Sequence, residues 1–162
     1  MKILDRIAWF YSVTHTRKLF KKKDYKTALE VASAAYDKAI NAFGPGHLKT
    51  AQTCYNLVVL NTEIRNFEEA EKYGIESLKI MENLRGKDHF TLLEDLRNLQ
   101  YMYKEWGKAD KVEELEKRIN NIIDPDGENE KDDEEKELIA ADEVVADEEH
   151  NDEQGQEEIA QE

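Results

Sequence analysis

The chain has 162 residues and a mass of 18.9 kDa, which suits one modest domain, with or without a tail, and is too small for a large two-domain enzyme. A net charge of −14 argues against a general nucleic-acid binder, because phosphate neutralisation needs clustered Lys and Arg. The single cysteine, Cys54, excludes an intramolecular disulfide and a Cys-based zinc site, and we expect a cytoplasmic protein.

Helices are predicted throughout residues 1–123, because apolar residues recur there at intervals of three and four positions. The longest apolar stretch, residues 7–11, is too short to span a bilayer or to form the core of a signal peptide. Turn-forming residues divide this part of the chain into six helices of roughly 14 to 20 residues, joined by short connections that favour antiparallel neighbours. The turns are expected at residues 23–24, 44–46, 65–66, 86–88 and 107–108.

An acidic tail is predicted for residues 124–162. It contains 19 acidic side chains and two lysines, whereas the rest of the chain has 18 acidic and 21 basic side chains. The tail has no aromatic residue and five large aliphatic ones, too few to offset the entropy lost on ordering, so we expect it to be disordered. It either solubilises the protein or folds against a partner through Leu138, Ala141 and Val145, which have helical spacing.

The sequence also matches itself at an offset of 42 residues. Such an internal repeat predicts three helical hairpins, at residues 1–43, 44–85 and 86–123. A small residue near the start of a hairpin's second helix lets the two helices pack closely. The matching pairs are Gly44 and Gly86, His47 and His89, Asn56 and Asn98, Leu57 and Leu99, Tyr25 and Phe67, and Ala28 and Ala70.

The stretch from His47 to Val112 resembles tetratricopeptide repeats (TPR) of the kinesin-light-chain type. The resemblance rests on Asn56-Leu57, on the segment Phe67–Glu71 and on the turn Gly86–His89. It implies an all-α fold, a right-handed solenoid of about three antiparallel helical hairpins, that works as a protein-binding adaptor or scaffold. Gly74 departs from an ideal helix at a cost of about 1 kcal/mol, so we expect the second and third hairpins to pack loosely.

In this family, the first helices of successive hairpins line a concave groove that binds a segment of another protein. The corresponding positions here give a mixed groove that is basic at one end. Asn56 and Asn98 either hold a peptide backbone through donor and acceptor together or only bridge adjacent hairpins. The predicted groove residues are Val13, Arg17, Phe20, Lys21, Gln52, Tyr55, Asn56, Val59, Thr62, Glu94, Arg97, Asn98 and Tyr101.

A basic cluster ends the first predicted helix. One interpretation is a solvated helix end, where cations suit the helix dipole. A second is a docking site for the protein's own acidic tail, which would screen the groove until a partner displaces it. A third is attraction to anionic lipid, although we expect the preceding apolar residues, from Ile3 to Tyr11, to be buried against a neighbouring helix. The cluster comprises Arg17, Lys18, Lys21, Lys22 and Lys23.

The sequence predicts neither catalysis nor a cofactor or metal. His47 and His89 are one complete repeat apart, so equivalent loop positions explain them better than shared metal ligation. Residues 124–135 imitate a calcium loop, but Asn129 takes the place of its required glycine. No phosphate-binding loop or nucleophile motif occurs. We therefore expect an adaptor, and the alternatives are a membrane-surface recruitment factor and a self-assembling scaffold.

Overall fold

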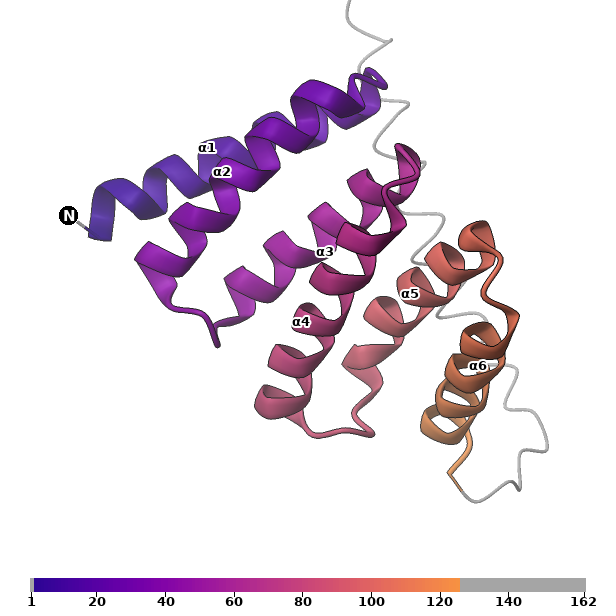
Figure 1. Cartoon of the computed structure of the whole chain (residues 1–162). Helices are drawn as coiled ribbons and strands as arrows, with labels where there is room; N and C mark the ends of the chain where they lie inside the picture. The colour runs from indigo at the N-terminus through magenta and orange to yellow at the C-terminus, as the bar shows by residue number, and fades with distance from the viewer. Residues whose placement is uncertain (1, 126–162) are drawn as a thin grey trace, which may run out of the picture. The chain divides into compact units, whose positions relative to one another are not determined.

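Six α-helices and one short 3₁₀-helix account for most of residues 2–125, the part of the chain that the computed structural model describes (Figure 1). This part contains no β-strand, so the predicted all-α class is confirmed. Of the predicted tail, residues 124–162, all but the first two residues lie outside the described part, as does most of the calcium-like segment. The elements are α1 (Lys2–Lys21), α2 (Tyr25–Phe43), α3 (Leu48–Glu63), α4 (Phe67–Arg85), η1 (Phe90–Leu92), α5 (Leu93–Trp106) and α6 (Ala109–Ile123).

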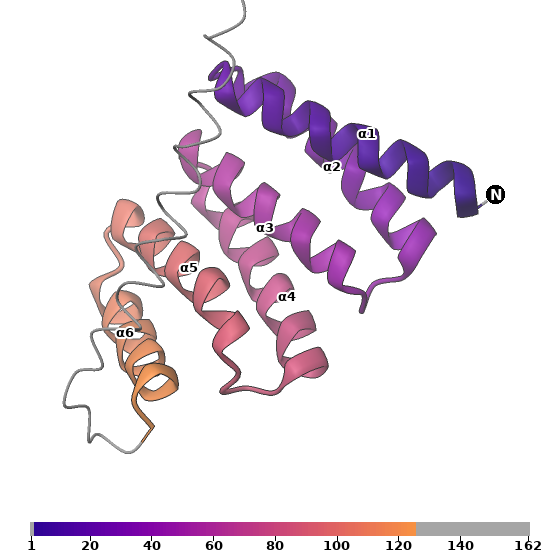
Figure 2. The same ribbon diagram turned by 180° about the vertical axis from the view of Figure 1, so that it is seen from behind.

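All five predicted turns separate consecutive helices, and the helices are 14 to 20 residues long, as expected. The 3₁₀-helix η1 in front of α5 was not predicted. Helices α1, α3 and α5 lie nearer the viewer in Figure 2, whereas α2 and α4 lie nearer in Figure 1. The first helices of the three hairpins therefore share one side of the described unit.

Backbone geometry repeats every 42 residues, in step with the sequence. Inside each hairpin, the residue before the N-cap of the second helix has a left-handed backbone, with φ of 59° at Lys23, 61° at Arg65 and 78° at Gly107. The next residue donates its backbone N–H to a carbonyl of the preceding helix, at 3.0, 2.8 and 2.9 Å in the three hairpins. Between hairpins, Gly44 and Gly86 have φ of 97° and 100°. The described residues are thus a helical repeat of three hairpins.

A stripe of buried alanines on α2 lets α1 and α3 pack closely against this helix. The alanines are separated by four and three residues in alternation, so they share one face of α2. At one end of the stripe they pack against Leu57 and Leu60 of α3, and at the other against Trp9 of α1. The stripe consists of Ala28, Ala32, Ala35, Ala39 and Ala42.

Gly74 of α4 lies directly against the Leu99 side chain of α5. A Cβ atom at this position would lie 2.3 Å from Cδ2 of Leu99, a side chain that is itself buried. The loose packing expected from a glycine inside a helix is therefore wrong at this contact. The missing side chain makes room for Leu99, and the conformational cost of glycine is offset by closer packing between the helices.

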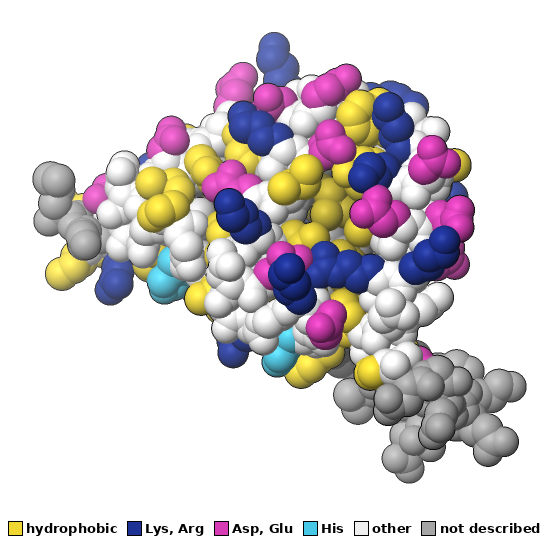
Figure 3. Space-filling model, turned by 60° about the horizontal axis from the view of Figure 1, so that its bottom comes forward, with side chains coloured by type: hydrophobic (Ala, Val, Ile, Leu, Met, Phe, Trp, Pro, Cys, Tyr) yellow, Lys and Arg dark blue, Asp and Glu magenta, His cyan; other side chains and the backbone are white. Residues whose placement is uncertain are grey.

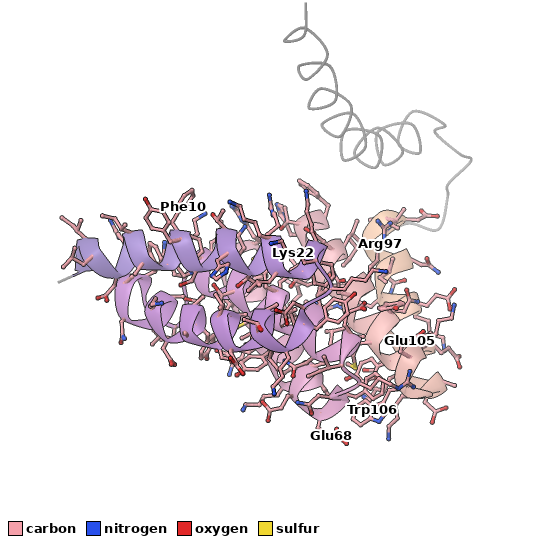
Figure 4. All side chains as sticks on the ribbon, turned by 90° about the horizontal axis from the view of Figure 1, so that it is seen from above. Phe10, Lys22, Glu68, Arg97, Glu105 and Trp106 are labelled. Carbon is pink, nitrogen blue, oxygen red and sulfur yellow. The ribbon has the colours of Figure 1, made fainter. Side chains whose placement is uncertain are left out.

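The expectation that the apolar residues from Ile3 to Tyr11 are buried is also wrong. Only Trp9 is, with 5% of its surface exposed. Helix α2 packs against one side of α1, and no described residue covers the opposite side, where Phe10 points outward (Figure 4). The exposed fractions are 71% for Ile3, 72% for Leu4, 49% for Ile7, 62% for Phe10 and 69% for Tyr11.

Charged side chains of both signs are interspersed over the face shown in Figure 3. Most ion pairs among the described residues are well exposed, so each contributes little to stability. The exception is Arg118, which bonds Glu82 at 2.6 Å and ties α6 to α4. None of the described helices is both long enough and apolar enough to cross a bilayer.

The contact at Gly74 predicts an unusual effect of alanine. Inside an exposed helix, Gly→Ala stabilises, but here Gly74→Ala should lower the stability by about 1–3 kcal/mol, because the new methyl overlaps Leu99. Leu99→Ala should cost about 2–5 kcal/mol on its own. Thermal melts of both single variants and the double variant would show a double-variant loss smaller than the sum. Additive losses, or a more stable Gly74→Ala, would contradict the contact.

Candidate functional site

A groove of about 360 Å³ lies between α1 and α3, with α5 at one end. Eight of the residues predicted from the sequence line it, and Thr16 and Leu60 complete its lining. Those eight come from three helices that are distant in the sequence, and we call their surface the α1–α3 groove. They are Val13, Arg17, Phe20, Gln52, Tyr55, Asn56, Val59 and Glu94.

The α1–α3 groove continues toward α5 as a second hollow of about 390 Å³. Arg17, Tyr55 and Glu94 line both hollows. The second hollow extends to Ser77 of α4 and Asp95 of α5. The two hollows therefore form one concave surface that runs from α1 across α3 to α5, long enough for an extended ligand.

Two predicted groove residues, Arg97 and Tyr101, line a different cavity. It has a volume of about 620 Å³ and lies between α5 and α6, where Lys104 and Lys108 add positive charge. These two side chains face α6 and not α3, so the structure separates them from the α1–α3 groove. Sequence reasoning missed this cavity, although the spacing of Arg97, Tyr101 and Lys104 puts all three on one face of a helix.

The remaining predicted residues also lie apart from the groove lining. The Thr62 side chain is buried, and its hydroxyl donates to the Val58 carbonyl at 2.8 Å. The Asn98 amide donates to the Glu94 carbonyl of its own helix at 2.9 Å. Lys21 is exposed at the end of α1. None of these three lines the hollows described above.

A buried hydrogen bond fixes the distance between the two main walls of the groove. The indole Nε1 of Trp9 on α1 donates to Thr53 Oγ1 on α3 at 2.9 Å. The Lys49 ammonium lies 5.1 Å from the centre of the Trp9 ring, and the Lys38 ammonium donates to Ser12 Oγ at 2.9 Å. These contacts hold α1 against α2 and α3, so the groove is preformed.

The Asn56 amide has no hydrogen-bond partner in the part of the chain that the structure describes. It is half-buried in the groove, and no residue between 2 and 125 forms a hydrogen bond with its side chain. Asn56 and Asn98 are equivalent positions of the 42-residue repeat. Among residues 2–125, however, the Asn98 amide is bonded to Glu94, whereas the donor and acceptor of Asn56 are both unbonded. An asparagine amide can pair with the N–H and C=O of an extended peptide at the same time.

The charge in the groove is asymmetric. Arg17 lies on the α1 side, whereas Glu94 and Asp95 lie on the α5 side. Burial raises the pKa of Tyr55, and the nearby Glu94 carboxylate raises it further against the opposing effect of Asn98. The Tyr55 hydroxyl therefore keeps its proton at neutral pH and is a hydrogen-bond donor beside the acidic end of the groove.

Asp95 is held by Ser77. Ser77 Oγ lies 2.6 Å from Asp95 Oδ1 and 3.1 Å from the Ala51 carbonyl oxygen. Burial raises the pKa of the Asp95 carboxyl, while the hydrogen bond from Ser77 opposes that rise and Glu94 adds to it. The sequence did not single out this pair, because Ser77 and Asp95 belong to different hairpins.

His47 and His89 are helix caps in this structure. Nδ1 of His47 accepts the Lys49 backbone N–H at 3.0 Å, and Nδ1 of His89 accepts that of Thr91 at 3.2 Å. Within residues 2–125, no group of three or more His, Cys, Asp or Glu side chains is placed to hold a metal ion. Cys54 is buried, and burial raises the pKa of its thiol, so the reactive thiolate is disfavoured.

Comparison with known proteins assigns no family. No protein-family model matches the chain, and no curated protein is significantly similar to it. The chemistry of the groove is therefore argued from its own residues. They provide an apolar floor, one free amide, a tyrosine donor and charges of opposite sign, a set suited to noncovalent recognition.

The buried carboxyl of Asp95 predicts a pH-dependent effect of Asp95→Asn. A raised pKa means that the folded state disfavours the charged form, so stability falls as the pH rises through that pKa. Asn keeps an acceptor for Ser77 and removes the charge. We expect a higher melting temperature for Asp95→Asn at pH 7, and a difference that shrinks toward zero at about pH 3, below the usual pKa of Asp.

Thermal melts of both proteins at the two pH values measure this effect. Asp37→Asn is the matched control, because Asp37 is exposed on α2. A melting temperature for Asp95→Asn below that of the unchanged protein at pH 7 would mean that the bond from Ser77 to a charged carboxylate stabilises the fold, contrary to the prediction.

Proposed function

We propose that this chain is a tetratricopeptide-type repeat protein whose α1–α3 groove binds an extended segment of a partner protein. The observation that carries the proposal is the convergence of eight predicted positions from α1, α3 and α5 on one concave surface. The recurrence of turn geometry every 42 residues supports the repeat assignment. The proposal thus has two parts: the three hairpins form a solenoid, and its groove binds protein.

The size of the groove sets the length of the ligand. A segment reaching from α1 to α5 crosses two helix-to-helix spacings of roughly 8–10 Å each. An extended chain covers that distance with about six residues, at roughly 3.3 Å per residue. The free Asn56 amide lies on the middle helix, where it can pair with the ligand backbone near its centre.

The groove also indicates the composition and direction of the ligand. Arg17 at the α1 end favours an acidic side chain, and Glu94 with Asp95 at the α5 end favours a basic one. Val13 and Phe20 of α1 and Val59 of α3 offer apolar contacts in the same groove. The best ligand therefore combines an acidic residue for the α1 end, a basic residue for the α5 end and apolar side chains.

Selection of random peptides on the full-length protein, followed by calorimetric titration of the enriched peptide, tests the proposal. Asn56→Ala should weaken binding at least about tenfold, because it removes both backbone contacts, and Arg17→Glu should do so by repelling the acidic residue. Asn83→Ala is the matched control and should leave the affinity unchanged, because Asn83 is exposed on α4 and does not line the groove.

Two outcomes would contradict the proposal. The first is an enriched peptide whose affinity is the same for Asn56→Ala and the unchanged protein. The second is an affinity that falls only with Arg97→Glu, which would place the binding surface in the cavity between α5 and α6.

A further inference from the structure

Helix α1 has an uncovered side whose composition changes along its length. In its first three turns this side exposes five apolar residues, between 49% and 72% each. In its last two turns it exposes three lysines. At 100° per residue these eight side chains fall within one half of the helix circumference, and we call them the outer face of α1. They are Ile3, Leu4, Ile7, Phe10, Tyr11, Lys18, Lys21 and Lys22.

The three lysines have no carboxylate partner among residues 2–125. Lys23, in the turn, and Arg17, beside them, are also exposed and free of ion pairs in this part of the chain. Five positive charges thus lie within seven residues, without an ion pair to any residue between 2 and 125. Figure 4 shows Lys22 at this end of α1 and Phe10 toward the other.

Single exposed apolar side chains are common on protein surfaces, but a contiguous patch indicates an interaction surface. The outer face of α1 presents five such residues in succession, including the rings of Phe10 and Tyr11, which lie edge-on to each other at 6.3 Å. A matching partner must provide an apolar region for the first half of the helix and negative charge for the second.

A second copy of the chain does not meet this requirement. Two outer faces packed in parallel would bring their lysines together, and packed antiparallel they would set the lysines of one copy against the apolar residues of the other. A helical peptide usually binds in a groove. The five exposed apolar residues line none of the cavities described above and lie on a convex helix surface.

We propose that the outer face of α1 binds the surface of membranes rich in anionic lipid. The bilayer provides a flat, deformable apolar layer for Ile7 and Phe10 and negative headgroups for Lys18, Lys21 and Lys22. Tyr11 is the last apolar residue before the lysines, and tyrosine favours the membrane–water interface. The helix lies on the membrane and does not cross it.

Binding in this orientation leaves the α1–α3 groove open. The groove is lined by Val13, Thr16, Arg17 and Phe20, which lie on the side of α1 that faces α3. The membrane surface and the proposed peptide site therefore use different sides of the same helix. The two functions can be lost separately, and the failure of one does not imply the failure of the other.

Co-sedimentation of the full-length protein with vesicles tests the membrane proposal. We expect binding to phosphatidylcholine vesicles that contain about one third phosphatidylserine, and little binding to phosphatidylcholine alone. Ile7→Ser/Phe10→Ser should weaken binding at least about tenfold, because it removes two inserted side chains. Lys18→Gln/Lys22→Gln should weaken it and reduce the preference for phosphatidylserine.

Ile75→Ser/Leu84→Ser is the matched control, because these residues of α4 are 54% and 47% exposed and lie outside the outer face of α1. It should bind vesicles like the unchanged protein. Melting temperatures of all variants should change little, since every replaced side chain is exposed and the least exposed of the apolar ones, Leu84, has 47% of its surface open.

No sedimentation with phosphatidylserine vesicles would overturn the proposal, and so would equal losses in the α1 and α4 variants. Light scattering tests a second copy of the chain as the occupant. A mass that rises with protein concentration and returns to the monomer value in Ile7→Ser/Phe10→Ser, without vesicle binding, would assign the outer face of α1 to a second copy of the chain.

Discussion

The close approach of neighbouring helices at small residues is the constraint on which the described structure depends. Five alanines on α2 let α1 and α3 pack against it, and Gly74 does the same where α4 meets Leu99 of α5. A larger side chain at these points would push the helices apart. The concave surface exists because α1 and α3 are held close enough for one groove to span them.

Each helix of the groove combines a structural side with a recognition side. On α3, Thr53 accepts the buried hydrogen bond from Trp9, while Asn56 points its free amide into the groove. On α5, Leu96 is fully buried, while Glu94 supplies charge at the end of the groove. Rigid positioning of free polar groups reduces the entropy lost when a ligand binds, which favours recognition of an extended segment.

The helices and their turns could be predicted because their signals are local. Glycine and turn residues mark the breaks, and an offset of 42 residues finds the repeat. Packing could not be predicted in the same way. Periodicity places Ile7 and Phe10 on a helix, but it does not reveal that nothing described covers them. It also could not show that Gly74 makes room for Leu99.

The candidate site was predicted in part for the same reason. Residues on α1 and α3 were identified correctly as neighbours, because the repeat fixes which helices lie side by side. Arg97 and Tyr101 were assigned to the same groove, but they face α6 in a separate cavity. The pair of Ser77 and Asp95 depends on contact between two hairpins, which no local pattern encodes.

The most direct test of the central claim, that a partner segment binds in the α1–α3 groove, is to map amide chemical shifts in the isotope-labelled full-length protein during titration with a peptide that binds it. We expect the largest chemical-shift changes along the α1–α3 groove, around Asn56. If the largest changes occur in the cavity between α5 and α6, the groove is not the binding surface.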